Sequence, residues 1–554
     1  MKTRAQTKFS RRRFILFAGA AASVAGTTTA HGAWYRVGRR WVWGYPPAYQ
    51  TTALRSRMAK ALAIRHETAN KQFEGSATVN HRPNDDESQH ANYVACFTKA
   101  LPHDAEGRVD GAAYRKLIDA VNSGLEAEFA SIPMGGARKL ANPQAAFAYS
   151  LCGADSHALM MPAAPTLTSA WEAGEMVEVY WQAALRDVPF ESYVTDSRVA
   201  AAVSDMNGLT DFRGPKQNGV VTPSTLFRGE TAGDLAGNYL SQFLLLDIPY
   251  GATTIQQRYR VPQQGDDYML TRTTWLDVQN GNVPEGPNQL DPVTRYLATG
   301  RDLGEYVHRD FSYQAFLNAA NILLGMGMPT QAGNPYHGRS NQGAFVTFGG
   351  PDILSLVAEV ALCGLKAAWF HKWCVHRRLR PEAFGGLVNA ELNGRAQYSL
   401  HSDVLNSAVL DQFGSQVERG LLPMAYPEGS PTHPAYPAGH AVIAGACTTA
   451  LKAFFDPDAI LAAPVEVDPD TDATSLRPFS GTDSLTVGGE LDKLAANISL
   501  GRDFAGVHWR TDGSEGLLLG EKVALQVLKD HMGTYTELGA SVSFRSFDGS
   551  LVEL

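Results

Sequence analysis

The strongest constraint on the fold of this chain is a long apolar run from Asp352 to Trp373. Residues 349–352 are Gly-Gly-Pro-Asp, so that a proline and an acidic residue stand where helices usually begin. A helix this rich in apolar residues has little polar surface to present to water and must be surrounded by other protein. We therefore predict a buried helix around which the rest of the chain packs.

The segment after this run, residues 371–381, concentrates positive charge. It holds two histidines and, before the first carboxylate at Glu382, these fixed cations: Lys372, Arg377, Arg378 and Arg380. Because buried cations are costly unless an anion neutralises them, the segment predicts an oxyanion site. Lys372 belongs to the last turn of the helix and Arg380 is held extended by the proline that follows, so both can converge on one point. The open alternative is a solvated basic helix end.

The length and charge of the chain limit its class. At 554 residues it can form one large domain or two closely packed ones; we divide it into an N-terminal helical region, residues 34–250, and a C-terminal helical region, residues 251–554, that carries the predicted site. The formal net charge of −8 gives no support for binding nucleic acid or an anionic membrane surface. Five scattered cysteines match neither a disulfide framework nor a zinc site, and at most one or two bridges are expected.

The first residues have the composition of an export signal. Residues 10–16 are Ser-Arg-Arg-Arg-Phe-Ile-Leu, followed by a small-residue apolar run and by Thr-Thr-Thr-Ala at 27–30. A basic start, an apolar centre and a cleavage site of small residues are typical of a signal peptide, and the arginines match the twin-arginine type. We predict such a signal peptide over residues 1–33, a periplasmic or secreted mature protein, and no further membrane-length apolar run. A disordered basic tail is the alternative.

Periodicity predicts a mainly α-helical protein. Helical patterns cover residues 53–73, 112–117, 121–129, 170–185, 235–246, 313–328 and 440–455. Residues 251–304 are rich in Gln, Asn, Pro and Gly, and we expect them to be mostly loop. At the end of the chain, residues 541–547 alternate in polarity and Asp548-Gly549 marks a turn before residues 550–554, which predicts a small C-terminal β-hairpin.

A proline-rich segment, residues 426–440, supplies a second set of groups suited to an anion. Its prolines restrain a loop that enters the helix predicted from His440, and Gly439 lets the backbone approach a ligand closely. The amide groups at that helix N-terminus favour an anion, and His440 stands where it can exchange a proton. His433 lies in the same loop. Structural or simply exposed histidines are the alternative.

A third segment, residues 502–512, contains Arg502, His508 and Asp512. If this segment is helical, His508 and Asp512 share one face at positions i and i+4. Asp512 can then hold one imidazole nitrogen and present the other to a ligand. A His–Asp pair on a helix surface is the alternative.

Together, the three segments resemble the vanadium-dependent haloperoxidases, whose superfamily includes the type 2 phosphatidic acid phosphatases and the bacterial acid phosphatases. The similarity to the algal bromoperoxidase type is nearly continuous over residues 315–386 and 490–521, and thinner over 222–250 and 96–119. The resemblance implies the helical-bundle fold of that family, a homo-oligomer, and vanadate as cofactor. The vanadate-binding residues would be Lys372, Arg380, Gly439, His440, Arg502 and His508, with His508 as the metal ligand.

The resemblance also implies a reaction. The enzyme would be a haloperoxidase that oxidises bromide or iodide with hydrogen peroxide to a hypohalous-acid equivalent, which then halogenates small organic acceptors. His440 would act as acid and base when hydrogen peroxide binds, and Lys372 would polarise the bound peroxide for attack by the halide. His433 matches the extra histidine of the bromoperoxidases, and Trp369 would line the halide side.

One position departs from the Pro-Ser-Gly-His motif of the family, because residue 438 is alanine. The serine would donate a hydrogen bond to an equatorial oxygen of vanadate. Its loss costs roughly 1–3 kcal/mol of binding free energy if nothing replaces that bond.

Two other functions use the same residues. An acid phosphatase would use His508 as the phosphorylated nucleophile and His440 as the acid, because phosphate and vanadate are similar oxyanions. An exported oxyanion-binding protein without catalysis would keep the pocket and bind its ligand stoichiometrically.

Overall fold

The computed structural model of the chain describes residues 33–37, 40–44, 52–282, 284, 286 and 288–554. The predicted signal peptide lies outside these residues except for its last position, so its type and its cleavage stay predictions. The chain divides into two units, Met1–Arg65 and His66–Leu554. In the first unit β1 (Ala33–Val37) pairs antiparallel with β2 (Arg40–Gly44), and α2 (Thr52–Thr78) begins there. The division expected at residue 250 also stays a prediction.

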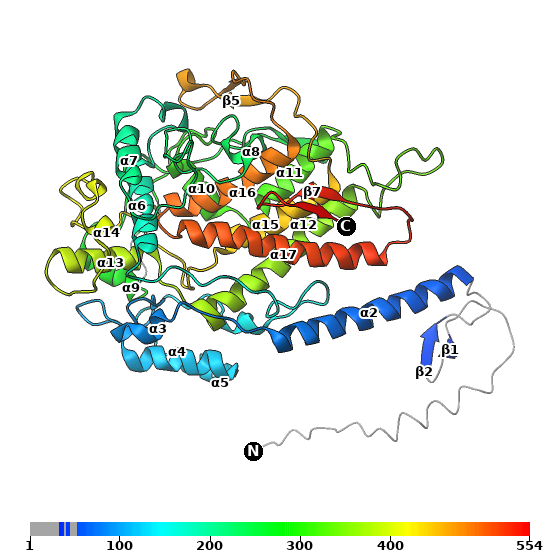
Figure 1. Ribbon diagram of the computed structural model, residues 1–554, viewed down its shortest axis with the longest axis horizontal. Coiled ribbons are helices and arrows are strands. Elements are labelled where there is room, and N and C mark those ends of the chain that lie inside the picture. Colours follow the sequence, from blue (N-terminus) through cyan, green and yellow to red (C-terminus); the bar gives the residue numbers. More distant parts are fainter. Residues whose placement is uncertain (1–32, 38–39, 45–51, 283, 285, 287) are drawn as a thin grey trace, which may run out of the picture. The chain divides into compact units, whose positions relative to one another are not determined.

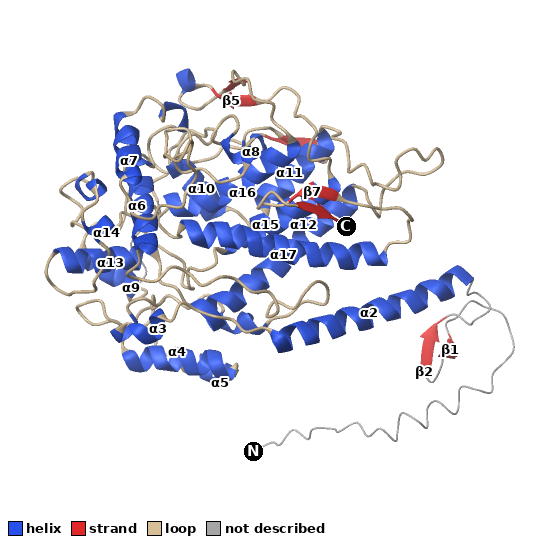
Figure 2. Cartoon of the chain, viewed as in Figure 1, coloured by secondary structure: helices blue, strands red, loops and turns tan. Residues whose placement is uncertain are grey.

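Helices dominate the second unit, which confirms the mainly α prediction (Figures 1 and 2). They are α3 (Asp86–Gln89), α4 (Gly111–Ser123), α5 (Glu126–Phe129), α6 (Ala170–Leu185), α7 (Ser197–Asn207), α8 (Ala232–Leu235), α9 (Arg272–Gln279), α10 (Gly300–Arg309), α11 (Gln314–Gly325), α12 (Gly350–Phe370), α13 (Pro381–Leu392), α14 (Ser402–Leu405), α15 (Gly439–Phe454), α16 (Val487–Phe504) and α17 (Arg510–Thr534).

The strands of the second unit form small antiparallel pairs in the described part of the chain. These pairs are β3 (Ile248–Tyr250) with β4 (Thr253–Ile255), β5 (Val465–Val467) with β6 (Leu476–Pro478), and β7 (Ser543–Arg545) with β8 (Leu551–Glu553). The last pair is the predicted C-terminal hairpin, in which Phe544 lies opposite Val552. Gly549 has a φ of 82° in its turn, a conformation that glycine adopts readily.

The predicted buried helix is α12, which continues into a π-helical turn, His371–His376. Helices α11, α15 and α17 pack against it.

By length and composition the stretch Gly350–His376 could cross a membrane, and it is the only such helix among the described residues. The expectation of no further membrane-length run is therefore wrong, although this stretch belongs to the packed core. Whether the mature protein avoids membranes stays a prediction.

Helix α15 lies at the centre of the fold, between α12, α16 and α17 (Figure 1). A Cβ atom on Gly445 of α15 would lie only 2.1 Å from the carbonyl oxygen of Leu517 in α17. Similarly, a Cβ atom on Gly520 of α17 would lie 2.0 Å from the carbonyl oxygen of Val442 in α15. The two helix backbones therefore approach so closely that only glycine fits at these positions.

The helix predicted over residues 235–246 is wrong. Helix α8 ends at Leu235, Gly237 turns the chain with a φ of 63°, and only a short 3-10 turn, Gln242–Leu244, follows. Except for Leu235, which is exposed, most of the apolar residues that suggested a helix are buried side chains on an irregular backbone. Burial therefore accounts for most of the apparent periodicity.

The expectation that residues 251–304 are mostly loop is partly wrong, because α9 lies inside this range and α10 begins at its end. Thr271 and Thr299 occupy the N-cap positions of these helices. The hydroxyl of each accepts a hydrogen bond from the backbone N–H three residues later. This capping box, a threonine followed by Thr274 or Asp302, was the sequence signal available for both helices.

Replacing Gly520 with alanine tests the close approach of α15 and α17. The added Cβ atom would push the helices apart, so we expect Gly520→Ala to lower the free energy of unfolding by about 1–3 kcal/mol, although alanine favours helices. Chemical denaturation followed by circular dichroism measures this change. Gly343→Ala is the matched control, since a Cβ atom there meets no atom within 4 Å. Equal stability of the two variants would contradict the packing argument.

Candidate active site

Lys372 lies in the π-helical turn His371–His376 that extends α12, close to the last-turn position predicted for it. Its side chain is fully buried, and Nζ donates to the carbonyl oxygens of Pro434 and Ala435, at 2.8 Å each. These carbonyls belong to the proline-rich segment. Burial, reinforced by the charge of Arg380, holds the pKa of Lys372 well below its usual value.

Arg380 has the extended backbone that the following proline requires, with φ −92° and ψ 156°, at the N-cap position of α13. Its buried guanidinium donates to the carbonyl oxygens of Val507 at 2.7 Å and His433 at 2.8 Å. Nη1 also donates to Nε2 of His508 at 2.9 Å. Burial lowers the pKa of Arg380 to about 9. This one side chain therefore contacts both the proline-rich segment, residues 426–440, and the segment 502–512.

Arg502 occupies the last turn of α16, where its guanidinium lies 5.7 Å from the centre of the Tyr426 ring. Nη1 donates to the carbonyl oxygen of Val307 at 2.7 Å. Nε is buried and has no hydrogen-bond partner among the described residues. Since a buried donor without a partner is costly, this guanidinium has unused capacity for an anion.

Lys372, Arg380 and Arg502 differ from the other buried cations in the described part of the chain. The other buried lysines and arginines each form an ion pair with a carboxylate: Lys99, Arg186, Arg301, Arg378, Lys452, Lys493 and Arg510. Lys372, Arg380 and Arg502 form no such pair within the described ranges. Buried positive charge without a counter-ion is unfavourable, so these three side chains fit a multiply charged oxyanion such as vanadate.

His508 lies between α16 and α17, so the helical placement considered from the sequence is wrong. The predicted contact between His508 and Asp512 is nevertheless present. Asp512 stands in the first turn of α17, and its Oδ2 lies 2.7 Å from Nδ1 of His508. Arg380 can only donate to Nε2, so the proton of the imidazole is on Nδ1. Burial, with the charges of Arg380 and Lys372, holds the pKa of His508 well below its usual range. The imidazole is therefore neutral, with its Nε2 lone pair on the cationic side.

His440 lies in the first turn of α15, which begins at Gly439, one residue earlier than predicted. Its Nε2 lies 2.9 Å from Oδ1 of Asp310, just after α10. Burial opposes ionisation of Asp310, but His440 and Arg502 outweigh it and hold the pKa of this carboxyl below its usual value. The carboxylate therefore accepts from Nε2, and Nδ1 is the nitrogen left to exchange a proton.

His433 and Trp369 lie against each other beside these cations, with ring centres 4.8 Å apart. Nη2 of Arg380 contacts Nδ1 of His433 at 3.0 Å. Burial and the charge of Lys372 hold the pKa of His433 well below its usual value, so this ring is neutral. A Cβ atom on Gly439 would lie 3.5 Å from Cζ3 of Trp369, an ordinary contact, so space alone does not require glycine there.

The structure thus brings every predicted site residue into one region. These residues are Lys372, Arg380, His433, Gly439, His440, Arg502 and His508. Five different elements supply them: the turn after α12, the N-cap of α13, the loop before α15, the start of α15, and the α16–α17 corner.

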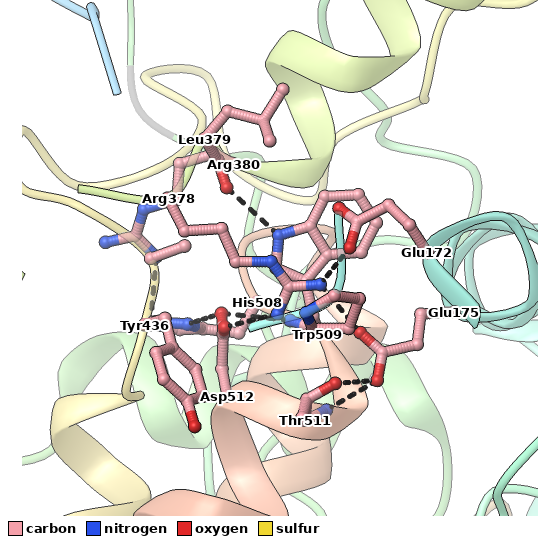
Figure 3. A network of polar contacts seen from close by, with 12 residues as sticks. Glu172, Glu175, Arg378, Leu379, Arg380, Tyr436, His508, Trp509, Thr511 and Asp512 are labelled. Carbon is pink, nitrogen blue, oxygen red and sulfur yellow. Dashed lines mark hydrogen bonds and ion pairs between the residues drawn. The ribbon is translucent and has the colours of Figure 1, made fainter. Parts of the chain in front are cut away.

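A second set of charges lies directly behind His508 (Figure 3). Arg378 pairs with Asp512 at 2.9 Å, with Glu175 at 2.8 Å and with Glu172, and all four side chains are buried. Both glutamates project from α6 towards the arginine. The arginine holds Asp512 in place, and Asp512 in turn orients the imidazole of His508.

Half of the basic segment therefore has a structural role that the sequence did not predict. Arg377 pairs with Glu87 at 2.5 Å, and Arg378 is neutralised by α6, which leaves Lys372 and Arg380 for a ligand. A signal for the α6 partners was present, because the glutamates at 172, 175 and 178 recur every three residues on an otherwise apolar helix. No local pattern marked Asp310, the partner of His440.

These features define a class of protein: a mainly helical protein whose helix ends surround a buried, cationic oxyanion site with a neutral histidine. Comparisons with known proteins agree with this class. The family model described as the VCPO second helical-bundle domain matches residues 413–536. This range contains most of the predicted site residues, but not Lys372 or Arg380.

Vanadium-dependent bromoperoxidases from Corallina pilulifera and Ascophyllum nodosum are 35% and 34% identical to this chain. The alignments cover 87% and 89% of this chain and 94% and 92% of those proteins. The homohexameric structure of the second vanadate-dependent bromoperoxidase from Ascophyllum nodosum matches with a TM-score of 0.87 at 29% identity, over 97% of this chain and 95% of that one. The chain belongs to the vanadium-dependent haloperoxidase family and is an enzyme of that family.

Asp512→Asn tests whether the bond to Asp512 prepares His508. The asparagine amide can donate to Nδ1, which would move the proton to Nε2 and remove the lone pair on the cationic side. We expect the affinity for orthovanadate, measured by isothermal titration calorimetry, to fall about 10-fold to 100-fold while circular dichroism shows a retained fold. Asp310→Asn, which changes the partner of His440 instead, is the matched control. Equal losses of affinity in both variants would contradict the role given to Asp512.

Proposed function

We propose that this chain is a vanadate-dependent haloperoxidase that uses hydrogen peroxide to oxidise bromide or iodide to a hypohalous-acid equivalent, which halogenates small organic acceptors. One observation carries the proposal: three buried cations without a carboxylate partner, among the described residues, lie beside a neutral histidine with an unprotonated Nε2. The names of the relatives support bromide as the preferred halide.

The chain binds vanadate chiefly through charge. Lys372, Arg380 and Arg502 supply positive charge and N–H donors for its oxygens, and the Gly439 amide adds a donor at the N-terminus of α15. His508 would supply Nε2 as the metal ligand, while Asp512 keeps the proton on Nδ1. When bound, vanadate supplies a Lewis-acidic centre that activates hydrogen peroxide without a change of metal oxidation state.

His440 moves the protons of the reaction. Because Asp310 holds Nε2, Nδ1, which has no hydrogen-bond partner among the described residues, is the nitrogen that can accept a proton from hydrogen peroxide and give it back. Its side chain is 24% exposed, which allows exchange with solvent. Lys372 is held by the carbonyl oxygens of Pro434 and Ala435, which orient its ammonium group without cancelling the charge that polarises the oxidant.

His433 and Trp369 line the side that receives the halide. The neutral His433 ring offers a hydrogen-bond donor rather than a fixed charge, so a halide is attracted without being held as an ion pair. The partly buried Trp369 ring covers the same side and limits the access of water.

Assembly and location are also part of the proposal. The homohexameric relative supports a homo-oligomer, whose size light scattering of the purified protein would measure. The arginine-rich start of the sequence supports export by the twin-arginine route to the periplasm or the medium. An N-terminus near residue 34 in the exported protein, measured by mass spectrometry, would support that route, whereas an intact N-terminus would contradict it.

A halide-dependence assay tests the proposed reaction. Purified chain is supplied with orthovanadate and hydrogen peroxide, and with chloride, bromide or iodide in turn, while halogenation of a phenol dye is followed. We expect turnover with bromide and iodide that requires vanadate and that inorganic phosphate inhibits by competition. Preferential hydrolysis of a phosphomonoester would favour the acid phosphatase instead. Stoichiometric binding of vanadate without turnover for any halide would favour a binding protein.

Ala438→Ser tests the one departure from the family motif. Ala438 is fully buried at the N-cap position of α15, where no side chain caps the helix. A serine hydroxyl there can accept from the first-turn amides and donate to an oxygen of vanadate. We expect vanadate to bind about 10-fold more tightly, or turnover to rise. Ala438→Gly lacks the hydroxyl and is the matched control; unchanged affinity and kinetics in the serine variant would show that the hydroxyl is irrelevant.

A further inference from the structure

Two cysteines that are far apart in the sequence meet at one face of α12. Cys152 lies in the segment 149–153, and Cys363 lies in α12 itself. The Cys152 thiol donates to the Glu359 carboxylate at 2.8 Å, and the Cys363 thiol donates to Oγ of Ser150 at 3.5 Å. Glu359 and Cys363 lie one turn apart on α12, and Ser150 lies two residues before Cys152, so these two bonds bring the thiols to the same place, and both thiols are free.

The segment 149–153, which carries Cys152, is anchored on both sides of this contact. Lys366 of α12 donates to the carbonyl oxygen of Tyr149 at 2.9 Å. On the other side, the Gly153 N–H donates to Asp530 of α17 at 2.7 Å. Because α12 and α17 both belong to the packed core, these bonds hold the segment that carries Cys152 against the face of α12 that carries Cys363.

The two thiols differ in acidity. Contact with Cys152 lowers the pKa of Cys363 to about 7, with Ser150 and Lys366 assisting and burial opposing. Contact with Cys363, burial and the Glu359 carboxylate all raise the pKa of Cys152. Since the thiolate is the nucleophile, Cys363 is the attacking sulfur and Cys152 the resolving one.

The other three cysteines have a different environment. Burial raises the pKa of Cys96 to about 12 and that of Cys374 to about 11, and it also raises the pKa of Cys447. A buried thiol with a raised pKa reacts slowly with oxidants, because little of it is ionised. These residues therefore serve as internal references for the reactivity of the pair.

We propose that Cys152 and Cys363 are a redox-active dithiol that hydrogen peroxide converts to a disulfide, joining the segment 149–153 to α12. The Cys363 thiolate attacks one peroxide oxygen, the O–O bond breaks, and the departing hydroxide takes up a proton to become water. The sulfur of Cys152 then attacks the resulting sulfenic acid, the S–O bond breaks, and the Cys152 proton leaves with the hydroxide as a second water. Two thiols lose two electrons in total, and one peroxide is reduced to two waters.

The proposed disulfide would be attached to α12, the helix that leads into the candidate active site, because Lys372 lies in the turn that continues α12. Its oxidant is also the oxidant of the proposed reaction, so a working enzyme meets it in every turnover. The thiol chemistry itself needs neither vanadate nor a halide. Failure of the proposed haloperoxidase activity would therefore leave this proposal standing, and the converse also holds.

Peptide mapping of the purified full chain tests the proposal. The reduced protein is treated with hydrogen peroxide in the absence of vanadate, and the remaining thiols are alkylated with N-ethylmaleimide after unfolding. Mass spectrometry should then find a peptide pair that joins Cys152 to Cys363 with the loss of two hydrogen atoms. The other three cysteines should be alkylated, and dithiothreitol should reverse the link. A wild-type protein without this link after peroxide treatment would overturn the proposal.

Single substitutions separate the two roles. In Cys152→Ser the reaction should stop at the sulfenic acid of Cys363, which dimedone traps, whereas in Cys363→Ser residue Cys152 should stay reduced under the same exposure. Cys447→Ser removes a buried cysteine of α15 and is the matched control, in which the link should still form. A link between two chains, visible on a non-reducing gel, would overturn the assignment of a pair within one chain.

Discussion

The active site depends on positive charge that the protein itself does not neutralise. Lys372, Arg380 and Arg502 are buried, and carbonyl oxygens rather than carboxylates hold them in place. A carbonyl dipole orients a cation while leaving most of its charge, whereas a carboxylate partner would cancel that charge. The positive charge of all three side chains therefore remains available to an oxyanion.

The opposite arrangement lies directly behind His508. There a single arginine, Arg378, is surrounded by carboxylates of α6 and α17, so its charge is compensated within the protein. Asp512 belongs to both regions, since it pairs with Arg378 and accepts from His508. The close packing of α15 and α17 extends this connection, because the N–H of Ala438, just before α15, donates to the carbonyl oxygen of Asp512 at 2.9 Å.

Much of the fold could be predicted, because helices begin and end through local signals. The Gly-Gly-Pro-Asp sequence marked the start of α12, and α6 has the predicted bounds. Prediction failed over residues 235–246, where apolar side chains are buried from an irregular backbone. A regular spacing of apolar residues can arise from a helix or from buried side chains on an irregular backbone. The sequence alone does not distinguish these cases, because the packing of the surrounding helices determines which one occurs.

The sequence by itself determined the chemical types at the site and the local conformations that present them, such as the extended backbone of Arg380 before a proline. Only the tertiary structure decided which charges remain available. Arg378 is neutralised by Glu172, 206 residues away, and His440 is held by Asp310, 130 residues away. The physical reason is range: a backbone conformation depends on adjacent residues, whereas an ion pair between distant segments forms only when packed helices bring its partners together.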